Sequence, residues 1–479
     1  MAPVSPEDTP DILQWNCRGL QACASELNLL FERIGYPSIL LLQETKGTSP
    51  GLHHYKALFS PSITHAHYGQ KKIQAQSAIL VHKDTPNAQL DTATFCTPHQ
   101  EIVAARIRYN NKHIVIASAY YRPSAKPQDT NFDWLWQLKH AYPRDAILVG
   151  GDFNAPHETW GYRNSSSIGT RLNTATEKAG LLLASDIDYP TRRGMQPGQR
   201  DTIPDLTWHS GNIIKDWRCG HETMGSDHYP IWIELNSTLR KRRRTTQTVN
   251  WQKFREALDG RLEELPVEHL LRRAKEQATT TTLVTTDVPT PDTHLLNLWE
   301  SRKQAEQEYI LSKKDYKKLL TLRKRTAEAR RYAKQLTREK WLDFCSTLSH
   351  RSGTGRLWRT FRAMNGQKKT RNNIENILIR TGQTVDELEH DAAYTFFPQP
   401  VHLPPYDIYT PLPSENSDGI NAPFSLFELE LALSQVKRNS APGKDGISWS
   451  MLRNADTNTK HKLLELINKH WQDGSLPKH

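Results

Sequence analysis

The first half of the chain is organised around one stretch, Ala146-Ile147-Leu148-Val149-Gly150-Gly151-Asp152-Phe153-Asn154. A short apolar run of this kind is typical of a buried β-strand, and an acidic and an amide side chain follow it directly. Rigid strands that present polar side chains at one rim are a common way to build an active site. The stretch therefore predicts a strand at residues 146–151, with Asp152 and Asn154 at its end.

Six further apolar runs surround this strand, at residues 11–15, 38–43, 77–82, 101–108, 113–121 and 229–235. Helical patterns fall between some of them, at residues 24–34 and 172–179. Many strands with interspersed helices predict an α/β domain in which helices cover the sheets. We place it at residues 11–236, after an N-terminal tail at residues 1–10.

The polar clusters of this domain share one chemistry. Magnesium prefers carboxylate and amide oxygens, which are available from Glu44, Asn16 and Asp227. A histidine beside an aspartate, as in Asp227-His228, can be held charged next to a phosphate. Asn154 and Tyr121 are donors suited to the charge of a phosphoryl transition state. The set predicts metal-assisted hydrolysis of a phosphate ester.

In order and local form these clusters resemble the endonuclease/exonuclease/phosphatase superfamily, which includes apurinic endonucleases and deoxyribonuclease I. Tyr121-Arg122-Pro123 and Pro204-Asp205-Leu206-Thr207 are similar to the endonucleases of non-LTR (LINE-type) retrotransposons. The resemblance implies a four-layered α/β sandwich. It also implies a Mg²⁺ cofactor, with Mn²⁺ as a substitute.

The resemblance assigns a role to each candidate catalytic residue. Glu44 is expected to be the principal metal ligand, with Asn16 in the metal shell and Asp227 completing the site. Tyr121, Asn154 and His228 are expected to contact the phosphate. Asp152 is expected to orient or deprotonate the attacking water, and Asp205 to orient His228. The sequence departs from the repair enzymes at Arg18, where they carry an aspartate.

The excess positive charge lies entirely in the second half of the chain. The formal net charge is +11 overall, but residues 1–236 have a net charge of −1 and residues 237–479 a net charge of +12. Such an asymmetry favours a polyanionic partner, most often nucleic acid.

No run approaches the roughly 18 apolar residues of a membrane span, so no membrane partner is expected. The five scattered cysteines include no C-x-x-C pair, which gives no support to a zinc site or a disulfide framework.

Three segments carry candidate nucleic-acid contacts. The run Arg240-Lys241-Arg242-Arg243-Arg244 is either a solvated linker or a patch for nuclear import or nucleic-acid binding. It lies in an expected basic and Thr-rich linker at residues 237–296. Residues 301–345 hold 14 Lys and Arg against six acids without Gly or Pro, which predicts one long basic helix within a helical region at residues 297–396. This helix either has an ordinary solvated face or binds phosphates, and its candidates are Lys324, Arg325, Arg330 and Arg331. Similarly, the loop at residues 191–202 either is solvated or lies on DNA through Arg192, Arg193 and Arg200.

The last segment has a second resemblance. After a Pro-rich connector at residues 397–424, the motif Ser440-Ala441-Pro442-Gly443-Lys444-Asp445-Gly446 is similar to the opening of non-LTR reverse transcriptases. The paired aspartates of the polymerase palm do not follow it, and no Tyr-x-Asp-Asp occurs in the chain. We therefore expect residues 425–479 to be the N-terminal fragment of such a domain, without polymerase activity.

The resulting hypothesis is a nuclear, Mg²⁺-dependent endonuclease that nicks target DNA and leaves a 3′-hydroxyl primer for reverse transcription. Element RNA is a further expected partner, through the basic helical region. Two alternatives stay open: a phosphatase of the same superfamily, and a decayed fragment that binds nucleic acid without cutting it.

Overall fold

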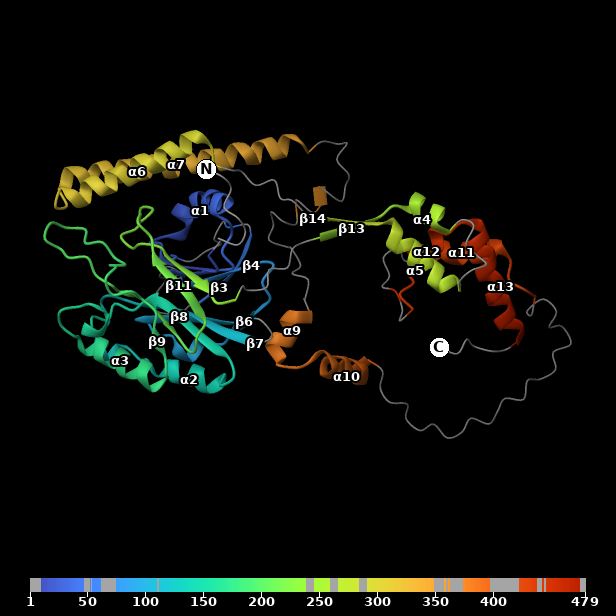
Figure 1. Ribbon diagram of the computed structural model, residues 1–479, viewed down its shortest axis with the longest axis horizontal. Coiled ribbons are helices and arrows are strands. Elements are labelled where there is room, and N and C mark those ends of the chain that lie inside the picture. Colours follow the sequence, from blue (N-terminus) through green and yellow to red (C-terminus); the bar gives the residue numbers. More distant parts are fainter. Residues whose placement is uncertain are drawn as a thin grey trace, which may run out of the picture. The chain divides into compact units, whose positions relative to one another are not determined.

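The computed structural model describes residues 10–46, 52, 54–61, 75–109, 112–237, 245–258, 266–283, 291–348, 357–358, 361, 374–396, 422–436, 442 and 445–473. The chain divides into two compact units. One comprises Met1–Arg242 with Asp287–Phe397, and the other comprises Arg243–Thr286 with Pro398–His479. Figure 1 labels their elements.

Two six-stranded mixed sheets form the centre of the first unit. The first sheet has the order β11-β12-β1-β2-β4-β3, and the second has the order β5-β6-β7-β8-β10-β9. The first consists of β1 (Ile12–Asn16), β2 (Ile39–Gln43), β3 (Tyr55–Phe59), β4 (Ser77–His82), β11 (Ile214–Cys219) and β12 (Ile231–Leu235). The second consists of β5 (Asn87–Leu90), β6 (Gln100–Tyr109), β7 (Lys112–Tyr121), β8 (Ala146–Asp152), β9 (Leu182–Leu183) and β10 (Asp205–His209).

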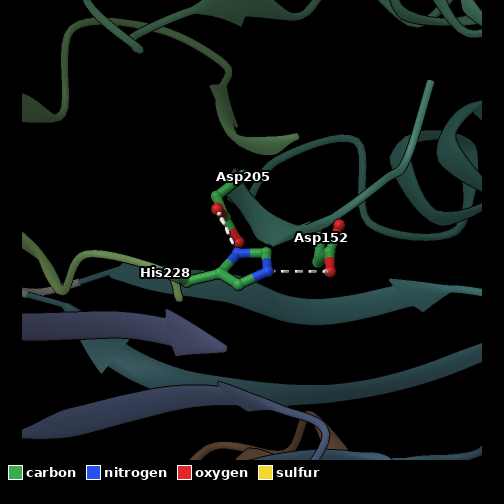
Figure 2. A group of neighbouring side chains, drawn as sticks. All are labelled: Asp152, Asp205 and His228. Atoms are coloured by element: carbon green, nitrogen blue, oxygen red, sulfur yellow. Dashed lines mark hydrogen bonds and ion pairs between the residues drawn. The ribbon is translucent and has the colours of Figure 1, made fainter. Parts of the chain in front are cut away.

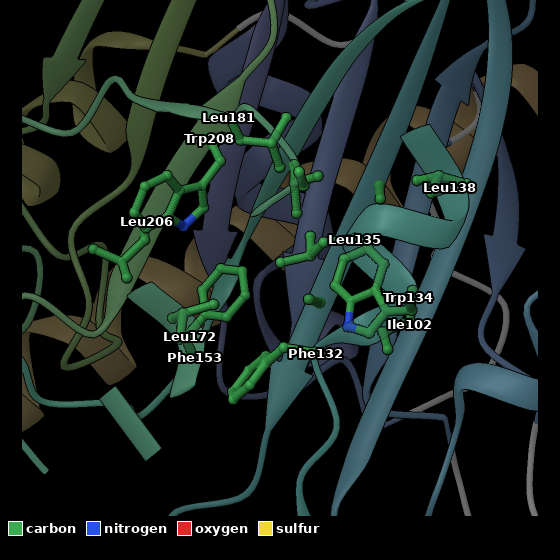
Figure 3. Close-up of a cluster of buried hydrophobic side chains, with 14 of the residues drawn as sticks. Ile102, Phe132, Trp134, Leu135, Leu138, Phe153, Leu172, Leu181, Leu206 and Trp208 are labelled. Carbon is green, nitrogen blue, oxygen red and sulfur yellow. The ribbon is translucent and has the colours of Figure 1, made fainter. Parts of the chain in front are cut away.

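The two sheets pack face to face and helices cover their outer faces. Alternate residues of β7 show the arrangement: Ile114 and Ile116 lie in the core between the sheets, whereas Val115 and Ala117 lie in the outer core. Helix α1 (Leu20–Ile34) covers the first sheet. Helices α2 (Asp133–Ala141) and α3 (Ser167–Lys178) cover the second, and Figure 3 shows the buried side chains of that layer, among them Leu135 and Leu172. Three short 3-10 helices, Ala93–Phe95, Pro127–Asp129 and Glu158–Trp160, lie in the loops. The predicted four-layered α/β sandwich is confirmed.

The topology brings several strand ends to one edge. Strands β1 and β2 run parallel with Asn16 opposite Gln43, and β7 and β8 run parallel with Tyr120 opposite Asp152. Strand β10 runs antiparallel to β8, so that its first residue, Asp205, also lies opposite Asp152. Residues distant in sequence therefore meet at this edge.

The basic region folds as two helices, which corrects the prediction of one. Helix α6 (Thr293–Leu311) and helix α7 (Tyr316–Ser346) pack side by side in Figure 1 as a hairpin, here called the α6–α7 hairpin. Lys313 and Lys314 adopt left-handed φ values of 55° and 67°, which no α-helix accommodates. Asp315 then caps α7 by accepting hydrogen bonds from two of its backbone amides, those of Lys317 and Lys318.

Two further helices, α9 (Ile374–Thr381) and α10 (Val385–Phe396), complete the described part of the first unit. Helix α9 contacts β5 and β6, and Arg106 of β6 donates a hydrogen bond to the carbonyl of Ile379 over 3.2 Å. Strand β5 is an edge strand, and α9 packs beside it, one of the ways in which proteins protect exposed sheet edges.

The second unit has a small helical core. Strands β13 (Thr245–Val249) and β14 (Thr279–Leu283) pair antiparallel and are joined through α4 (Trp251–Leu258) and α5 (Val267–Ala278). Phe254, Leu270 and Met451 are among the residues that form one buried cluster. The segment from residue 422 onward contributes α11 (Leu426–Gln435), α12 (Trp449–Asn454) and α13 (Thr457–Asp473).

Two expectations change here. The Thr-rich stretch does not begin as a flexible linker, because Thr279–Leu283 forms a paired strand, and α4 and α5 fold within the expected linker at residues 237–296. Residues 243–286 supply most of the buried cluster of the second unit, and Met451 and Ala455 of the final segment complete it. The basic run at residues 240–244, Gly443 and Lys444 lie outside the described residues, as does nearly all of the Pro-rich connector.

Candidate active site

A buried histidine lies between two aspartates at the shared strand edge (Figure 2). His228 Nδ1 is 2.7 Å from Asp205 Oδ2, and Nε2 is 4.0 Å from Asp152 Oδ2. All three side chains are buried. Thr191 Oγ1 donates to Asp205 Oδ2 over 2.8 Å, and Trp15 Nε1 donates to the His228 carbonyl over 3.0 Å. The imidazole is thus fixed at its ring and its backbone.

The surroundings favour the charged form of this imidazole. Burial lowers the pKa of His228, but the charge and hydrogen bond of Asp205, with the charges of Asp152 and Asp227, raise it to about 9. The Nδ1–H therefore donates to Asp205, and Nε2–H faces the edge that holds Asp152. An imidazolium held in this way suits a negatively charged ligand.

Asp152 has one carboxylate oxygen that is not used within the site, as Asp205 also has. The Oδ2 of Asp152 accepts a hydrogen bond from Asn16 Nδ2 over 2.8 Å, whereas its Oδ1 is buried with no partner among the described residues. Burial raises the pKa of Asp152 to about 7, helped by Asp205 and Glu44 and opposed by His228 and Asn16. A buried carboxylate with a spare oxygen and a raised pKa can accept a proton from water.

Asn16 connects Asp152 to Glu44. Its Nδ2 is also 3.2 Å from Glu44 Oε1, and its Oδ1 accepts a hydrogen bond from the Arg18 amide over 3.2 Å. Glu44 directly follows β2 and has a left-handed φ of 49°. Strained backbone of this kind at a strand end is often found where a side chain must be aimed at a site.

The oxygen donors beside Asn16 fit a divalent cation better than the histidine cluster does. Asp152, Asp205 and His228 each offer an atom within 4.8 Å of the others. A protonated His228 has no lone pair for a metal, however, and its Nδ1 is engaged by Asp205. Glu44 and Asn16 offer hard oxygen ligands of the kind that Mg²⁺ takes, and the unpartnered Asp152 Oδ1 stays available to accept a proton.

Asp227 is held by two arginines and does not join that set. Its Oδ1 is 3.4 Å from Arg18 Nη1, and its Oδ2 is 3.1 Å from Arg192 Nε. Burial alone would raise the pKa of Asp227, but His228, Arg18 and Arg192 lower it below its usual value. The predicted metal ligands are therefore only partly brought together: Glu44 and Asn16 are adjacent, and Asp227 is an ion-pair partner.

Tyr121 does not face the site, which corrects its predicted contact with phosphate. The side chain is 1% exposed and stacks on Phe153 in the outer core. Its hydroxyl accepts from Trp134 Nε1 over 2.9 Å and donates to the Asn131 carbonyl over 3.1 Å. Side chains alternate between the two faces of a strand, and the residue of β7 that pairs with Asp152 is Tyr120. Tyr121 therefore points to the opposite face of the sheet.

Tyr120 is the tyrosine on the site face, and the sequence reading missed it. It lies opposite Asp152 in the β7–β8 register. Burial, followed by the negative charges of Glu44 and Asp152, raises the pKa of Tyr120 well above its usual value, so its phenol remains a donor. Counting the alternation of β7 from its buried residues would have selected Tyr120 over Tyr121.

Asn154 lies at the site edge in a constrained turn. Its φ is 45°, and its Nδ2 donates to the Tyr121 carbonyl over 2.9 Å. One of the two amide hydrogens is therefore engaged, and the second remains for a ligand.

The candidate nucleic-acid contacts are distributed unevenly. Arg193 is 2% exposed and forms a buried ion pair with Glu306 of α6, which contradicts its placement on the DNA-facing loop surface. Arg200 is exposed, and Arg192 is held by Asp227. On α7, Lys324, Arg325 and Arg331 are exposed, and Arg330 donates to the Met224 carbonyl over 3.2 Å.

Among the described residues, no helix is both long and apolar enough to cross a bilayer.

Comparisons in sequence found a family model and a protein to which this chain is similar. A family model described as endonuclease-reverse transcriptase matches residues 114–232. A probable RNA-directed DNA polymerase from transposon BS of Drosophila melanogaster is 24% identical over 240 residues, which cover 47% of this chain and 24% of that protein. The chain thus matches about a quarter of that relative's length.

The solved structures similar to this chain align with about half of it. The endonuclease domain of TRAS1, a telomere-specific non-LTR retrotransposon, is 23% identical with a TM-score of 0.37, covering 47% of this chain and 97% of that domain. A 3′ phosphatase, NExo from Neisseria, bound to a product DNA hairpin, is 18% identical with a TM-score of 0.36, covering 48% of this chain and all of that one (100%). The catalytic domain of human Nocturnin is 18% identical with a TM-score of 0.33, covering 47% and 93%.

The acidic, histidine-containing edge of the sandwich lies within the residues that match the endonuclease-reverse transcriptase family model. More particularly, part of the chain is similar in sequence to a transposon RNA-directed DNA polymerase, and about half of it is similar to the endonuclease domain of a non-LTR retrotransposon.

Proposed function

We propose that residues 11–236 are a Mg²⁺-dependent DNA endonuclease that nicks target DNA of a non-LTR retrotransposon, in the nucleus, and leaves a 3′-hydroxyl. The observation that supports it most directly is the array in which His228 lies between Asp205 and Asp152, with Asp152 joined through Asn16 to Glu44. It places a charged donor, a proton acceptor and a set of hard oxygen ligands at one edge.

Each group has a defined part in the cleavage of a phosphodiester. Asp152 Oδ1 accepts a proton from the attacking water, whose oxygen bonds to phosphorus. The bond from phosphorus to the 3′ oxygen breaks, and that oxygen takes a proton from solvent water and is released as a hydroxyl, leaving a 5′-phosphate. His228 Nε2–H and the Tyr120 phenol donate hydrogen bonds to the non-bridging oxygens. Glu44 and Asn16 would hold a divalent cation, which would supply charge stabilisation at the phosphate.

Nicking of supercoiled plasmid by the full chain tests this function. We expect conversion to open circle with Mg²⁺ and none with EDTA. His228→Ala is expected to lower the rate about 10²- to 10⁴-fold, because it removes a charged donor. The exposed His221, changed to alanine, is the matched control. A folded protein that never nicks DNA would contradict the proposal, and release of inorganic phosphate from a 3′-phosphorylated end instead would favour the phosphatase alternative.

The two neighbouring tyrosines give a second test, since they face opposite sides of β7. We expect Tyr120→Phe to lower the nicking rate about tenfold or more without changing stability, because it removes a donor at the site. Tyr121→Phe removes the oxygen that Trp134 Nε1 donates to, and we expect a loss of about 1–3 kcal/mol in the free energy of unfolding with near-normal nicking. The reverse pattern in nicking rates and urea denaturation would return the phosphate contact to Tyr121.

A further inference from the structure

The α6–α7 hairpin is attached to the catalytic domain by buried charges. Arg302 of α6 is 2% exposed and pairs with Glu26 of α1 over 2.5 Å and with Glu222. Glu306 pairs with Arg193 and accepts from the Thr223 amide over 3.3 Å. Buried charges stay in place only when each is matched, so these pairs fix the hairpin against the segments at residues 193 and 222–223.

Helix α7 then packs against the turn that carries the catalytic histidine. A Cβ atom added to Gly225 would lie 2.4 Å from Thr326 Cγ2 and 2.9 Å from Arg330 Nη2. Gly225 also has a φ of +85°, a conformation in which glycine is strongly favoured. Since Asp227 and His228 follow two and three residues later, α7 lies directly beside the active-site turn.

A basic cavity of about 460 Å³ lies between α7 and this turn, here called the α7 cavity. Five cationic side chains line it, and the lining includes no Asp or Glu: Arg18, Lys46, Arg193, Arg323 and Arg330. Two of these cations have carboxylate partners: Arg193 pairs with Glu306, and Arg18 pairs with Asp227. Arg18 and Ser226 border both the cavity and the catalytic site, because Arg18 pairs with Asp227 and Ser226 precedes it.

We propose that the α7 cavity binds a backbone phosphate of the DNA strand next to the cleaved bond. The inference rests on the proposed endonuclease and makes the α6–α7 hairpin part of its DNA-binding surface. A concave site with this excess of cations suits a dianion or a phosphodiester, and its continuity with the catalytic edge selects the DNA being cut. Arg18 gains a role here: where the repair enzymes carry an acid, this chain presents a half-exposed guanidinium toward the neighbouring phosphate.

A charge-matched pair of double variants tests this proposal in the full chain. Lys46→Ala with Arg323→Ala removes two exposed cations of the cavity, and Lys334→Ala with Lys340→Ala removes two exposed cations of α7 outside it. Both are made in an Asp152→Asn background, so that a 30-base-pair duplex can be bound without being cut. Circular dichroism confirms that both fold.

The expected result is a specific loss for the cavity variant. We expect its affinity for duplex DNA to fall about tenfold or more at about 0.1 M salt, and the slope of log affinity against log salt to fall by about 0.9, the value for one lost phosphate contact. The control should lose less than about threefold. In the active background, kcat/KM for plasmid nicking should fall with kcat largely kept.

Three outcomes would overturn the inference: equal losses in both double variants, unchanged DNA affinity, or a loss confined to single-stranded RNA, which would assign the cavity to RNA. The binding assay does not require cleavage. Absence of nicking by the wild type would therefore refute the endonuclease, while the cavity would still be tested by binding.

Discussion

Asp152→Asn is expected to lower the nicking rate at saturating DNA by about 10²- to 10⁴-fold, the range for loss of a general base. The asparagine amide keeps the shape and can still contact Asn16, but it cannot take a proton from water. DNA affinity should change little, because the residue is buried and binds no phosphate by itself. Single-turnover cleavage of plasmid, compared with DNA binding, measures the two effects separately.

The stability of this variant provides the control. The pKa of Asp152 is raised to about 7 in the fold, above its ordinary value of 3.8. For a group with a raised pKa, the stabilising contribution is complete below the unfolded pKa and is lost as the pH rises through about 7. In EDTA at pH 8 the charged Asp152 therefore destabilises the fold, and Asp152→Asn should be as stable as the wild type or more stable. A variant that lost activity together with stability at pH 8 would indicate a structural role instead.

The sequence predicts the inner strands well and the outer strands poorly. Strands β1, β2, β4, β6, β7, β8 and β12 coincide with the apolar runs, because most of their residues are buried and few of them are polar. Strand β5 reads Asn-Ala-Gln-Leu, and β11 contains Lys215, Asp216 and Arg218. Both are edge strands, so one side of each is exposed to solvent. Their mixture of polar and apolar residues therefore resembles that of a loop.

The same reasoning explains which site residues could be found. Asn16, Glu44, Asp152 and Asp205 end or begin strands, so that the parallel and antiparallel registers bring them together. Tyr121 was selected because of its motif, although the alternation along β7 turns it away from the site. The ion pairs of Asp227 with Arg18 and Arg192 depend on how the loops fold. The spacing of these residues in the sequence does not predict them.

The sequence also did not predict that the α6–α7 hairpin packs against the α/β sandwich. The charge of the hairpin predicts a helix facing solvent or phosphate, yet Arg302 is among the most deeply buried side chains of the chain, and Arg193 is equally enclosed. Nothing in their local sequence distinguishes them from the exposed Lys303 or Arg200, because their carboxylate partners lie about 80 to 280 residues away in the chain. Only the tertiary structure separates binding cations from structural ones.

Arg302→Ala is therefore expected to be the most destabilising substitution in the α6–α7 hairpin. It leaves Glu26 and Glu222 without their shared guanidinium, and breaking a buried pair in this way costs about 3–5 kcal/mol. Urea denaturation followed by tryptophan fluorescence measures the loss, and limited proteolysis should cut α6 and α7 much faster than in the wild type. Lys303→Ala, at the exposed neighbouring position, should change the free energy of unfolding by less than about 0.5 kcal/mol.

Two further measurements separate lost charge pairing from lost packing. Burial raises the pKa of Glu222, and Arg302 opposes that rise, so the substitution raises it further. Since a raised carboxyl pKa costs stability as the pH rises through it, the deficit should be smaller at pH 5 than at pH 8. The triple variant Arg302→Met, Glu26→Gln, Glu222→Gln should recover most of the loss, because no unmatched charge remains buried. A deficit that is independent of pH and persists in the triple variant would show that Arg302 holds the hairpin by packing alone, and that the buried ion pairs do not anchor it.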